Sequence, residues 1–355
     1  MRNKKKIGAL VLAGAMMFSM GTSAFAAEEA PTVDKNGQAS ITKDFVMAEG
    51  ITTPASTFQF TATSTTEGAP KATINNITFA NTEDGKTEKG VKTVSKKSDI
   101  SFEAFPHAGE YVYTVKETAE TATDVEYSTD TYTLRVYVKN GDKGLEIRNM
   151  TAEKGTSNGT DTNKVSEMKF TNTYRKDASL EITKVTTGEL ADKTKDFDFT
   201  ITITPSKTET NQDSSYTGKI GEEEVTVNAN QETIFQLHDG ETLRFDSLPA
   251  GTRYVVTEAG KKDGYKPSVT VMENGTTTVT DKEASSDAEG ISSANTQATN
   301  LVGEGENSVT FTNIYKEVPL TGIFMNNLPF VIVIGIAVLA LGALAILKKQ
   351  RSARQ

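Results

Sequence analysis

The sequence predicts an all-β protein with two tandem β-sandwich domains, and three observations support this fold class. First, Val, Ile, Thr, Tyr and Phe alternate with polar residues in short runs, the pattern of half-buried strands, at 111–115, 131–138, 197–203 and 308–313. Second, turn sequences such as KNGDKG and MENGT separate these runs. Third, no long amphipathic helical pattern occurs between the two ends of the chain, and the length between those ends suits about two domains.

The N-terminal segment 1–26 has the pattern of a secretory signal peptide. A basic MRNKKK stretch precedes an apolar run, and the small-x-small sequence AFA ends at Ala26. We expect cleavage after Ala26 and export of the rest of the chain.

The C-terminal end predicts a membrane anchor. Segment 323–347 has no charged residue and is long enough for a helix that crosses a bilayer, which needs about 20 apolar residues. The basic segment 348–355 follows and should stay in the cytoplasm, so that everything before the span lies outside. Just before the span stands a short polar motif at 318–322, formed by Val318, Pro319, Leu320, Thr321 and Gly322.

Charge and composition exclude several function classes. Four of the 38 basic residues lie in the signal peptide and four in the tail, which leaves 30 basic against 47 acidic residues and a net charge of −17. Such a chain is not expected to bind nucleic acid. Two isolated histidines and no cysteine give no metal-ligand spacing, and no motif indicates a cofactor. An exported chain without cysteines must also be stabilised without disulfides.

An internal repeat divides the remaining chain into an N-terminal domain at 27–174 and a C-terminal domain at 178–316. FQFTAT is echoed by FDFTIT, and MKFTNTY is echoed by VTFTNIY. Both copies contain a lysine, a glutamic acid and an asparagine separated by 74 and then 55 positions: Lys43, Glu117 and Asn172 in the first, Lys184, Glu258 and Asn313 in the second. Shared spacing across dissimilar loops indicates that the three residues act together.

Alternation places the glutamic acids and asparagines on the same strand face as nearby aromatic residues, so we expect them to point inward. The lysine and the glutamic acid of each copy could form a buried ion pair to which the asparagine adds a hydrogen bond, but buried ion pairs often give no net stabilisation. A covalent outcome explains all three residue types. Desolvation favours neutral lysine, a nucleophile, and neutral glutamic acid, which can hydrogen-bond and polarise the asparagine carboxamide oxygen and shuttle a proton to departing ammonia. The product is a Lys–Asn amide, and Glu117 and Glu258 act as proton shuttles in a single turnover, so the protein is not an enzyme.

These motifs resemble those of a known family. The two copies look like the Ig-like, Cna-B-type intramolecular isopeptide domains of Gram-positive pilins, and the mature chain resembles the streptococcal T-antigen type of major shaft pilin. Segment 318–322 is similar to the LPXTG sorting signal of sortase substrates, with Val318 in place of leucine. The resemblance implies isopeptide bonds Lys43–Asn172 and Lys184–Asn313, and cleavage between Thr321 and Gly322.

The resemblance also implies partners and a location. The Thr321 carbonyl would pass to a lysine of another copy of this chain through a pilus-specific class C sortase. A housekeeping sortase would attach the polymer to peptidoglycan, minor pilins would accompany it, and the pilus would be extracellular and wall-anchored. By similarity the acceptor is Lys164, with Lys154 and Lys169 as alternatives. A monomeric wall-anchored adhesin is the alternative function. The polar segment 281–300 is expected to be a flexible loop.

Overall fold

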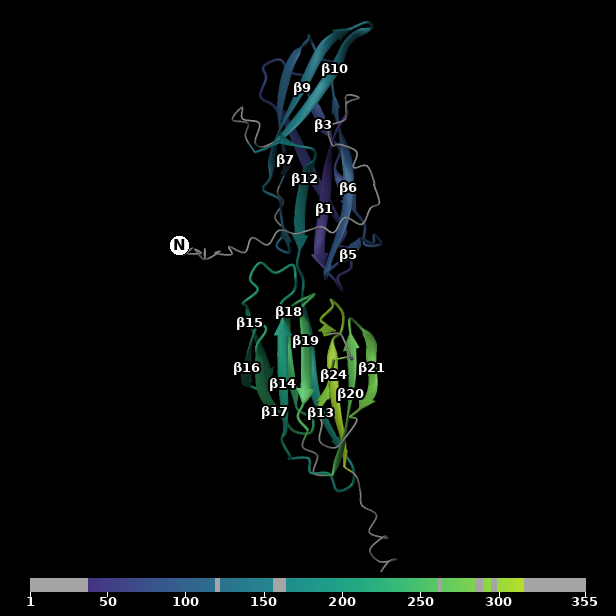
Figure 1. Cartoon of the computed structure of the whole chain (residues 1–355), viewed down its shortest axis with the longest axis vertical. Coiled ribbons are helices and arrows are strands. Elements are labelled where there is room, and N and C mark those ends of the chain that lie inside the picture. Colours follow the sequence, from purple (N-terminus) through teal and green to yellow (C-terminus); the bar gives the residue numbers. More distant parts are fainter. Residues whose placement is uncertain are drawn as a thin grey trace, which may run out of the picture.

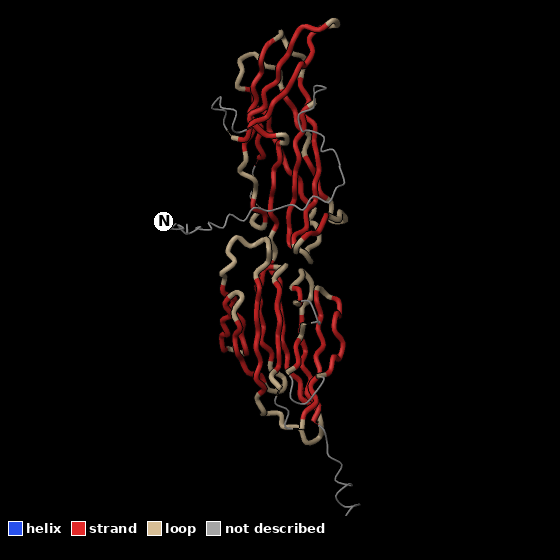
Figure 2. The backbone as a smooth tube through the Cα atoms, viewed as in Figure 1, coloured by secondary structure: helices blue, strands red, loops and turns tan. Residues whose placement is uncertain are grey.

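The computed structural model describes residues 38–118, 122–155, 164–260, 264–284, 290–294 and 299–315. These residues form two β-sandwich bodies stacked end to end along one long axis (Figure 1), and strands dominate both (Figure 2). The predicted all-β class is confirmed. We call residues 38–174 domain 1 and residues 177–315 domain 2.

In domain 1, the described strands form two sheets. The first sheet has the order β3-β6-β1-β12-β8, with β5 also paired to β6: β3 (Ala72–Ile74), β6 (Val91–Phe102), β1 (Ala39–Ala48), β12 (Met168–Tyr174), β8 (Val125–Glu126) and β5 (Lys86–Glu88). The facing sheet has the order β11-β10-β9-β7-β2-β4: β11 (Lys164–Val165), β10 (Gly144–Lys154), β9 (Thr131–Gly141), β7 (Gly109–Thr118), β2 (Ser56–Ser64) and β4 (Ile77–Phe79).

Domain 2 repeats this arrangement within the described residues. Its larger sheet has the order β16-β15-β18-β13-β24-β20-β21: β16 (Glu223–Asn228), β15 (Ser215–Ile220), β18 (Thr242–Pro249), β13 (Asp177–Thr187), β24 (Ser308–Tyr315), β20 (Tyr265–Glu273) and β21 (Thr276–Glu283). The facing sheet has the order β17-β14-β19-β22, with β23 also paired to β19: β17 (Glu232–Leu237), β14 (Phe197–Thr204), β19 (Arg253–Glu258), β22 (Ile291–Ser292) and β23 (Asn300–Leu301).

Segment 281–300 differs from its expected character as a loop. β21 extends to Glu283, and both β22 and β23 pair antiparallel with β19. Ile291 is 2% exposed and Asn300 also 2%, so burial of a few side chains outweighs the polar composition around them. The flexible-loop prediction is therefore wrong for these two short stretches.

The same topological feature recurs in both domains and decides the position of the site. The first strand of each domain lies beside its last strand, and the two run parallel: β1 pairs with β12, and β13 with β24. Parallel neighbours so far apart in sequence close a long loop of chain. A bond between the two strands would therefore tie the beginning of each domain to its end.

The two domains meet in a short, specific junction. Only Arg175 and Lys176 separate β12 from β13. Ala250, which directly follows β18, packs into the hydrophobic core of domain 1. Gly251 beside it has φ +90°, and a Cβ there would lie 2.4 Å from the Cβ of Ala48, so glycine is required both by conformation and by space.

Polar contacts reinforce the junction. Arg253 of domain 2 forms an ion pair with Glu49 of domain 1 at 2.5 Å. Glu304 accepts the backbone N–H of Thr52 at 3.1 Å and pairs with Lys176 at 3.4 Å. The junction therefore limits how freely one domain can turn on the other.

Candidate functional site

The structure brings Lys43, Glu117 and Asn172 together inside domain 1; we call them cluster 1. Lys43 on β1 and Asn172 on β12 come from the parallel neighbours of one sheet, and Glu117 on β7 comes from the facing sheet. The Lys43 Nζ lies 2.8 Å from Glu117 Oε2, and Asn172 Nδ2 donates to Glu117 Oε1 at 2.6 Å. One carboxylate therefore bridges the amine and the carboxamide.

Lys184, Glu258 and Asn313 form an equivalent arrangement in domain 2, which we call cluster 2. Lys184 on β13 and Asn313 on β24 are again on parallel neighbours, and Glu258 is on β19 of the facing sheet. The Lys184 Nζ lies 3.0 Å from Glu258 Oε2, and Asn313 Nδ2 donates to Glu258 Oε1 at 2.5 Å.

Strict alternation along the strands explains why these polar side chains point inward. In β7, Tyr113, Val115 and Glu117 are all buried, with exposed or half-buried residues between them. The same period of two buries Phe170 and Asn172 in β12. Because every second residue of a strand lies on the same face, apolar residues that turn one face inward also bury the polar residues on that face.

The environment of each lysine is apolar. Lys43 and Lys184 are both 0% exposed, and their Nζ atoms lie 4.5 Å and 4.1 Å from the ring centroids of Phe58 and Phe197. Burial lowers the pKa of each lysine to about 8, although the partner carboxylate opposes the shift. About a tenth of each amine is therefore neutral at pH 7, and this neutral form is the nucleophile.

The hydrogen bond from glutamate to carboxamide differs from the one we expected. Glu117 and Glu258 face the Nδ2 atoms of the asparagines, not the carboxamide oxygens. In cluster 1 the Asn172 Oδ1 instead accepts the backbone N–H of Ser128 at 2.7 Å. This arrangement suits proton transfer to the nitrogen that would leave as ammonia, because the glutamate already contacts that nitrogen.

The three candidate acceptor lysines all lie in domain 1. Lys164 is exposed on β11, whose short pairing with β10 places it opposite Glu153. Lys154, at the end of β10, pairs with Asp130 at 2.8 Å. Lys169 on β12 lies 3.3 Å from the carboxylate of Asp44.

Charge pairing shifts the pKa of Lys154 and of Lys169. The pKa of Lys154 is raised by its hydrogen bond to Asp130. Partial burial lowers the pKa of Lys169, but the charges of Asp44 and Glu167 outweigh it and raise the pKa overall. Both amines are therefore held more firmly in the protonated form, which cannot attack a carbonyl.

The remaining predicted segments lie outside the described residues. These are the signal peptide, the motif Val318–Gly322, the span 323–347 and the basic tail. Among the residues that the structure describes, no helix is long and apolar enough to span a membrane. In the same residues, no group of three or more His, Asp or Glu side chains could hold a metal ion.

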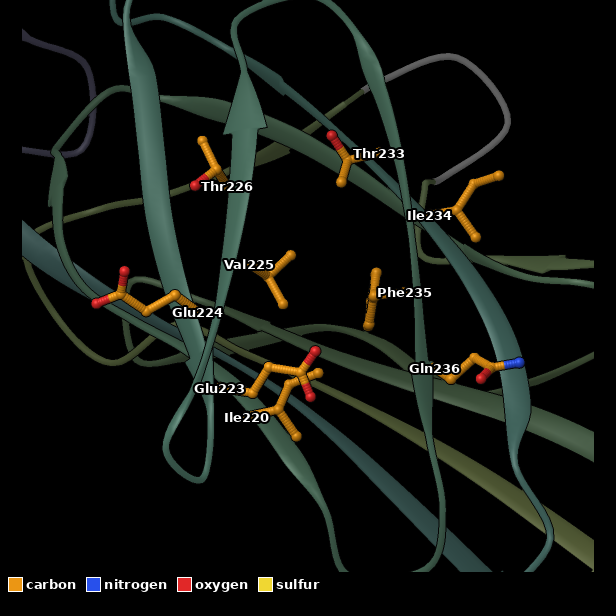
Figure 3. A pocket seen from close by; sticks show the side chains of 9 residues that line it. All are labelled: Ile220, Glu223, Glu224, Val225, Thr226, Thr233, Ile234, Phe235 and Gln236. Atoms are coloured by element: carbon orange, nitrogen blue, oxygen red, sulfur yellow. The ribbon is translucent and has the colours of Figure 1, made fainter.

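A surface groove occurs at the edge of domain 2. It lies between the edge strands β16 and β17, where Figure 3 shows Val225 and Phe235 between the strands and Ile234 directed away from them. Ile234 is 73% exposed. None of the groove-lining residues belongs to cluster 2, so the groove is a separate surface feature.

Comparison with protein families assigns each domain. Residues 39–175 match the model of the Spy0128-like isopeptide containing domain. Residues 178–315 match a domain of unknown function, DUF7601.

Comparison with curated proteins finds pilus proteins. The chain is 29% identical to a pilin of Streptococcus pyogenes serotype M1 over 287 residues, which cover 79% of this chain and 77% of that pilin. It is 41% identical to the pilus tip adhesin Cpa of S. pyogenes over 90 residues, which cover 25% of this chain but only 12% of the adhesin. These relatives are pilus proteins and not enzymes.

Solved structures of S. pyogenes major pilins are also similar. The T3.2 pilin is 25% identical, with 80% of this chain and 99% of that chain covered and a TM-score of 0.37. The T-13 pilin is 24% identical, with the same coverage and a TM-score of 0.35. On the family and sequence matches, the chain is homologous to the S. pyogenes pilin, and its residues 39–175 match the Spy0128-like isopeptide containing domain.

Proposed function

We propose that this chain is the backbone subunit of a covalent pilus and that each of its domains closes itself with a Lys–Asn isopeptide bond. The observation that carries the proposal is the pair of buried clusters, in each of which a glutamate bridges a lysine amine and an asparagine carboxamide at 2.5–3.0 Å. Homology to the S. pyogenes pilin supports the assignment to the pilus shaft.

The proposed reaction balances without a cofactor. Lys43 transfers one proton to Glu117, and the neutral Nζ then attacks the carboxamide carbon of Asn172. Glu117 delivers its proton to Nδ2 and then takes the surplus proton from Nζ, the carbon–nitrogen bond to Nδ2 breaks, and the leaving ammonia accepts this second proton and departs as ammonium. Glu117 ends as it began, so each domain performs one turnover; Lys184, Glu258 and Asn313 do the same in domain 2.

Polymerisation is the second part of the proposal. A class C sortase would cleave between Thr321 and Gly322 and transfer the Thr321 carbonyl to Lys164 of another copy. A housekeeping sortase would then join the finished polymer to peptidoglycan, with minor pilins attached. The exposed position of Lys164 on β11 supports its choice as acceptor, with Lys154 and Lys169 as the alternatives.

Intact-mass spectrometry of residues 27–321 tests the crosslinks. Each amide releases one ammonia, so the chain should be about 34 Da lighter than its sequence mass. Glu117→Gln and Glu258→Gln should each restore about half of this deficit. Glu110→Gln is the matched control, because Glu110 is exposed on the same strand as Glu117 and pairs with Arg135 outside the core. An unshifted wild-type mass would reject the crosslinks.

Polymer formation needs a separate test. Wall digests of cells that express the chain with its sortases should give a ladder of high-mass species that survives boiling in detergent. A monomer alone, released from the wall by the same digestion, would favour the wall-anchored adhesin instead.

A further inference from the structure

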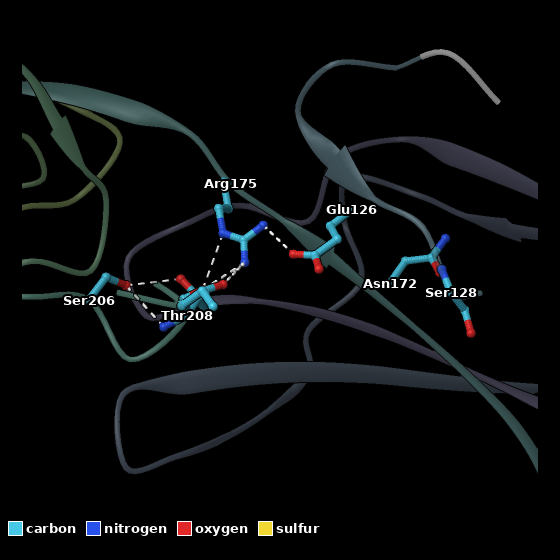
Figure 4. Close-up of polar contacts among 7 residues, drawn as sticks. Glu126, Ser128, Asn172, Arg175, Ser206 and Thr208 are labelled. Atoms are coloured by element: carbon cyan, nitrogen blue, oxygen red, sulfur yellow. Dashed lines mark hydrogen bonds and ion pairs between the residues drawn. The ribbon is translucent and has the colours of Figure 1, made fainter. Parts of the chain in front are cut away.

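The two clusters differ at one atom, the carboxamide oxygen of the asparagine. In cluster 1, Asn172 Oδ1 accepts the backbone N–H of Ser128 at 2.7 Å. In cluster 2, Asn313 Oδ1 is buried and has no hydrogen-bond partner among the described residues. Figure 4 shows Ser128 directly beside Asn172, on the segment that continues from Glu126.

The local fold explains why the Ser128 N–H is available. β8 pairs with β12 only through Val125 and Glu126, and the chain then leaves the sheet. The N–H of Ser128 is thus directed at a side chain instead of at a neighbouring strand. Ser128 Oγ accepts the N–H of Asp130 at 3.3 Å, a turn that holds the segment in place.

Domain 2 follows a different path at the equivalent position. Its strand β20 takes the place of β8 next to the last strand, but it stays paired with β24 from Tyr265 to Met272. The residue opposite Asn313 is Pro267, which has no N–H, and Ser268 remains paired with Thr312. Cluster 2 therefore has no counterpart of the Ser128 donor among the described residues.

The position of this donor matters for the reaction. When the Lys43 Nζ attacks the carboxamide carbon, negative charge develops on Asn172 Oδ1. A backbone N–H already fixed at hydrogen-bond distance from that oxygen stabilises the charge without reorganisation, in a site that excludes water. The Glu117 carboxylate already contacts both reacting nitrogens, Lys43 Nζ and Asn172 Nδ2, so it cannot also donate a hydrogen bond to Asn172 Oδ1.

We propose that the backbone N–H of Ser128 is an oxyanion donor for formation of the domain 1 isopeptide bond and that domain 2 closes its bond without such a donor. The proposal rests on the proposed function, because it concerns the rate of the same crosslinking reaction. It adds a group that touches a reacting atom and that no side-chain motif encodes.

The test removes the N–H and leaves the rest of the cluster in place. Ser128→Pro deletes the donor, whereas Ser128→Ala keeps it and removes only the hydroxyl. Thr129→Pro is the matched control for placing proline in this segment, because it retains the Ser128 N–H. Ser128 lies outside β8, so proline there breaks no strand pairing.

The assay is a time course of newly made chain. Residues 27–321 are synthesised in a cell-free system, quenched in acid at intervals, digested and analysed by mass spectrometry. The crosslinked peptides that contain Lys43–Asn172 and Lys184–Asn313 report on the two domains separately. The rate of the domain 2 crosslink serves as the internal reference in every sample.

We expect Ser128→Pro to slow the domain 1 bond by about 100-fold, the usual effect of losing one oxyanion donor, while the bond still forms completely at long times. Thr129→Pro and the domain 2 bond should keep wild-type rates, and Ser128→Ala, which keeps the N–H but loses the turn contact to Asp130, should be slowed far less than Ser128→Pro. Equal rates for Ser128→Pro and Ser128→Ala would overturn the proposal. So would equal slowing by Thr129→Pro, or a domain 1 bond that never forms, because either shows that proline displaced the reacting groups. If wild-type chain loses no ammonia in either domain, the proposed function fails instead.

Discussion

Removing Asn313 should reveal how much the domain 2 crosslink stabilises the fold. Asn313→Ala deletes the electrophile and leaves the buried Lys184–Glu258 pair at 3.0 Å in place. Loss of either charged partner would instead leave a buried charge unpaired, which is costly by itself. The asparagine is therefore the position at which the crosslink can be removed with the fewest other changes.

The expected magnitude follows from the length of chain that the bond closes. Positions 184 and 313 are 129 residues apart. The chain-entropy model gives about 5 kcal/mol for a loop of this length. For a domain of this size, we expect the unfolding midpoint of domain 2 to fall by roughly 15–25 °C.

Differential scanning calorimetry of residues 27–321 measures this effect, with intact mass confirming the loss of one ammonia deficit. Asn172→Ala should lower the domain 1 transition by a similar amount, because positions 43 and 172 are also 129 residues apart. Asn228→Ala is the control; Asn228 is exposed on β16 and makes one side-chain hydrogen bond, to Ser215 at 2.8 Å. If Asn313→Ala loses the crosslink and yet shifts the transition no more than this control, the chain-entropy reasoning is refuted.

Three further outcomes are expected. Burial lowers the pKa of Lys43 and Lys184 to about 8, and the reactive pair of neutral lysine and protonated glutamic acid holds the same single proton as the ion pair. The crosslinking rate should therefore stay flat from pH 6 to 8 and fall about tenfold for each pH unit above 8, where the pair loses that proton; a rate that keeps rising above pH 8 would contradict this. Lys164→Arg should abolish the detergent-resistant ladder, and polymers that persist would move the acceptor to another lysine. Glu304→Ala removes the contacts to Thr52 and Lys176 and should widen the distribution of interdomain angles in small-angle X-ray scattering. An unchanged distribution would show that the apolar contacts alone hold the two domains in place.

Much of the site could be predicted from the sequence because it is encoded by strand periodicity. Glu117 and Asn172 stand at even spacing from buried Tyr113 and Phe170, so the same inward face carries all four. Repetition of the spacing in the second half then pointed to partners that lie 55 and 74 positions apart. The fold class was predictable for the same reason, since alternation is the primary signal of a half-buried strand.

Other features depended on contacts that a sequence pattern does not contain. The Ser128 donor is a backbone N–H, and its role follows from where β8 ends. The orientation of the Asn172 carboxamide follows from that donor and was predicted wrongly. β22 and β23 were missed because each pairs over only two residues within a polar segment.

The interdomain junction could not be predicted from the sequence either. It depends on loops from both domains, and its contacts join residues such as Glu49 and Arg253 that are 204 positions apart. Neither residue stands out in the sequence, because single exposed charges are common and have no pattern. The close approach of the two domains, which Gly251 permits, brings these two residues into contact.

The parallel placement of first and last strands, together with the proposed acceptor, determines which crosslink should carry tension in a polymer. Force that enters at Lys164 would pass along β12 to β13, cross from Lys184 to Asn313 and leave toward Thr321. Most of domain 1, including Lys43, would lie outside this path and would bear no tension.

Single-molecule stretching of polymers should therefore separate the two bonds. Glu258→Gln would release the roughly 130 residues between Lys184 and Asn313, about 430 Å of extended chain per subunit. Glu117→Gln should add almost no length, because the chain from Lys164 to Lys184 is the same with or without the domain 1 bond. Equal extension for the two variants would show that force enters before Lys43, and the acceptor would then have to lie N-terminal to β1 rather than at Lys164.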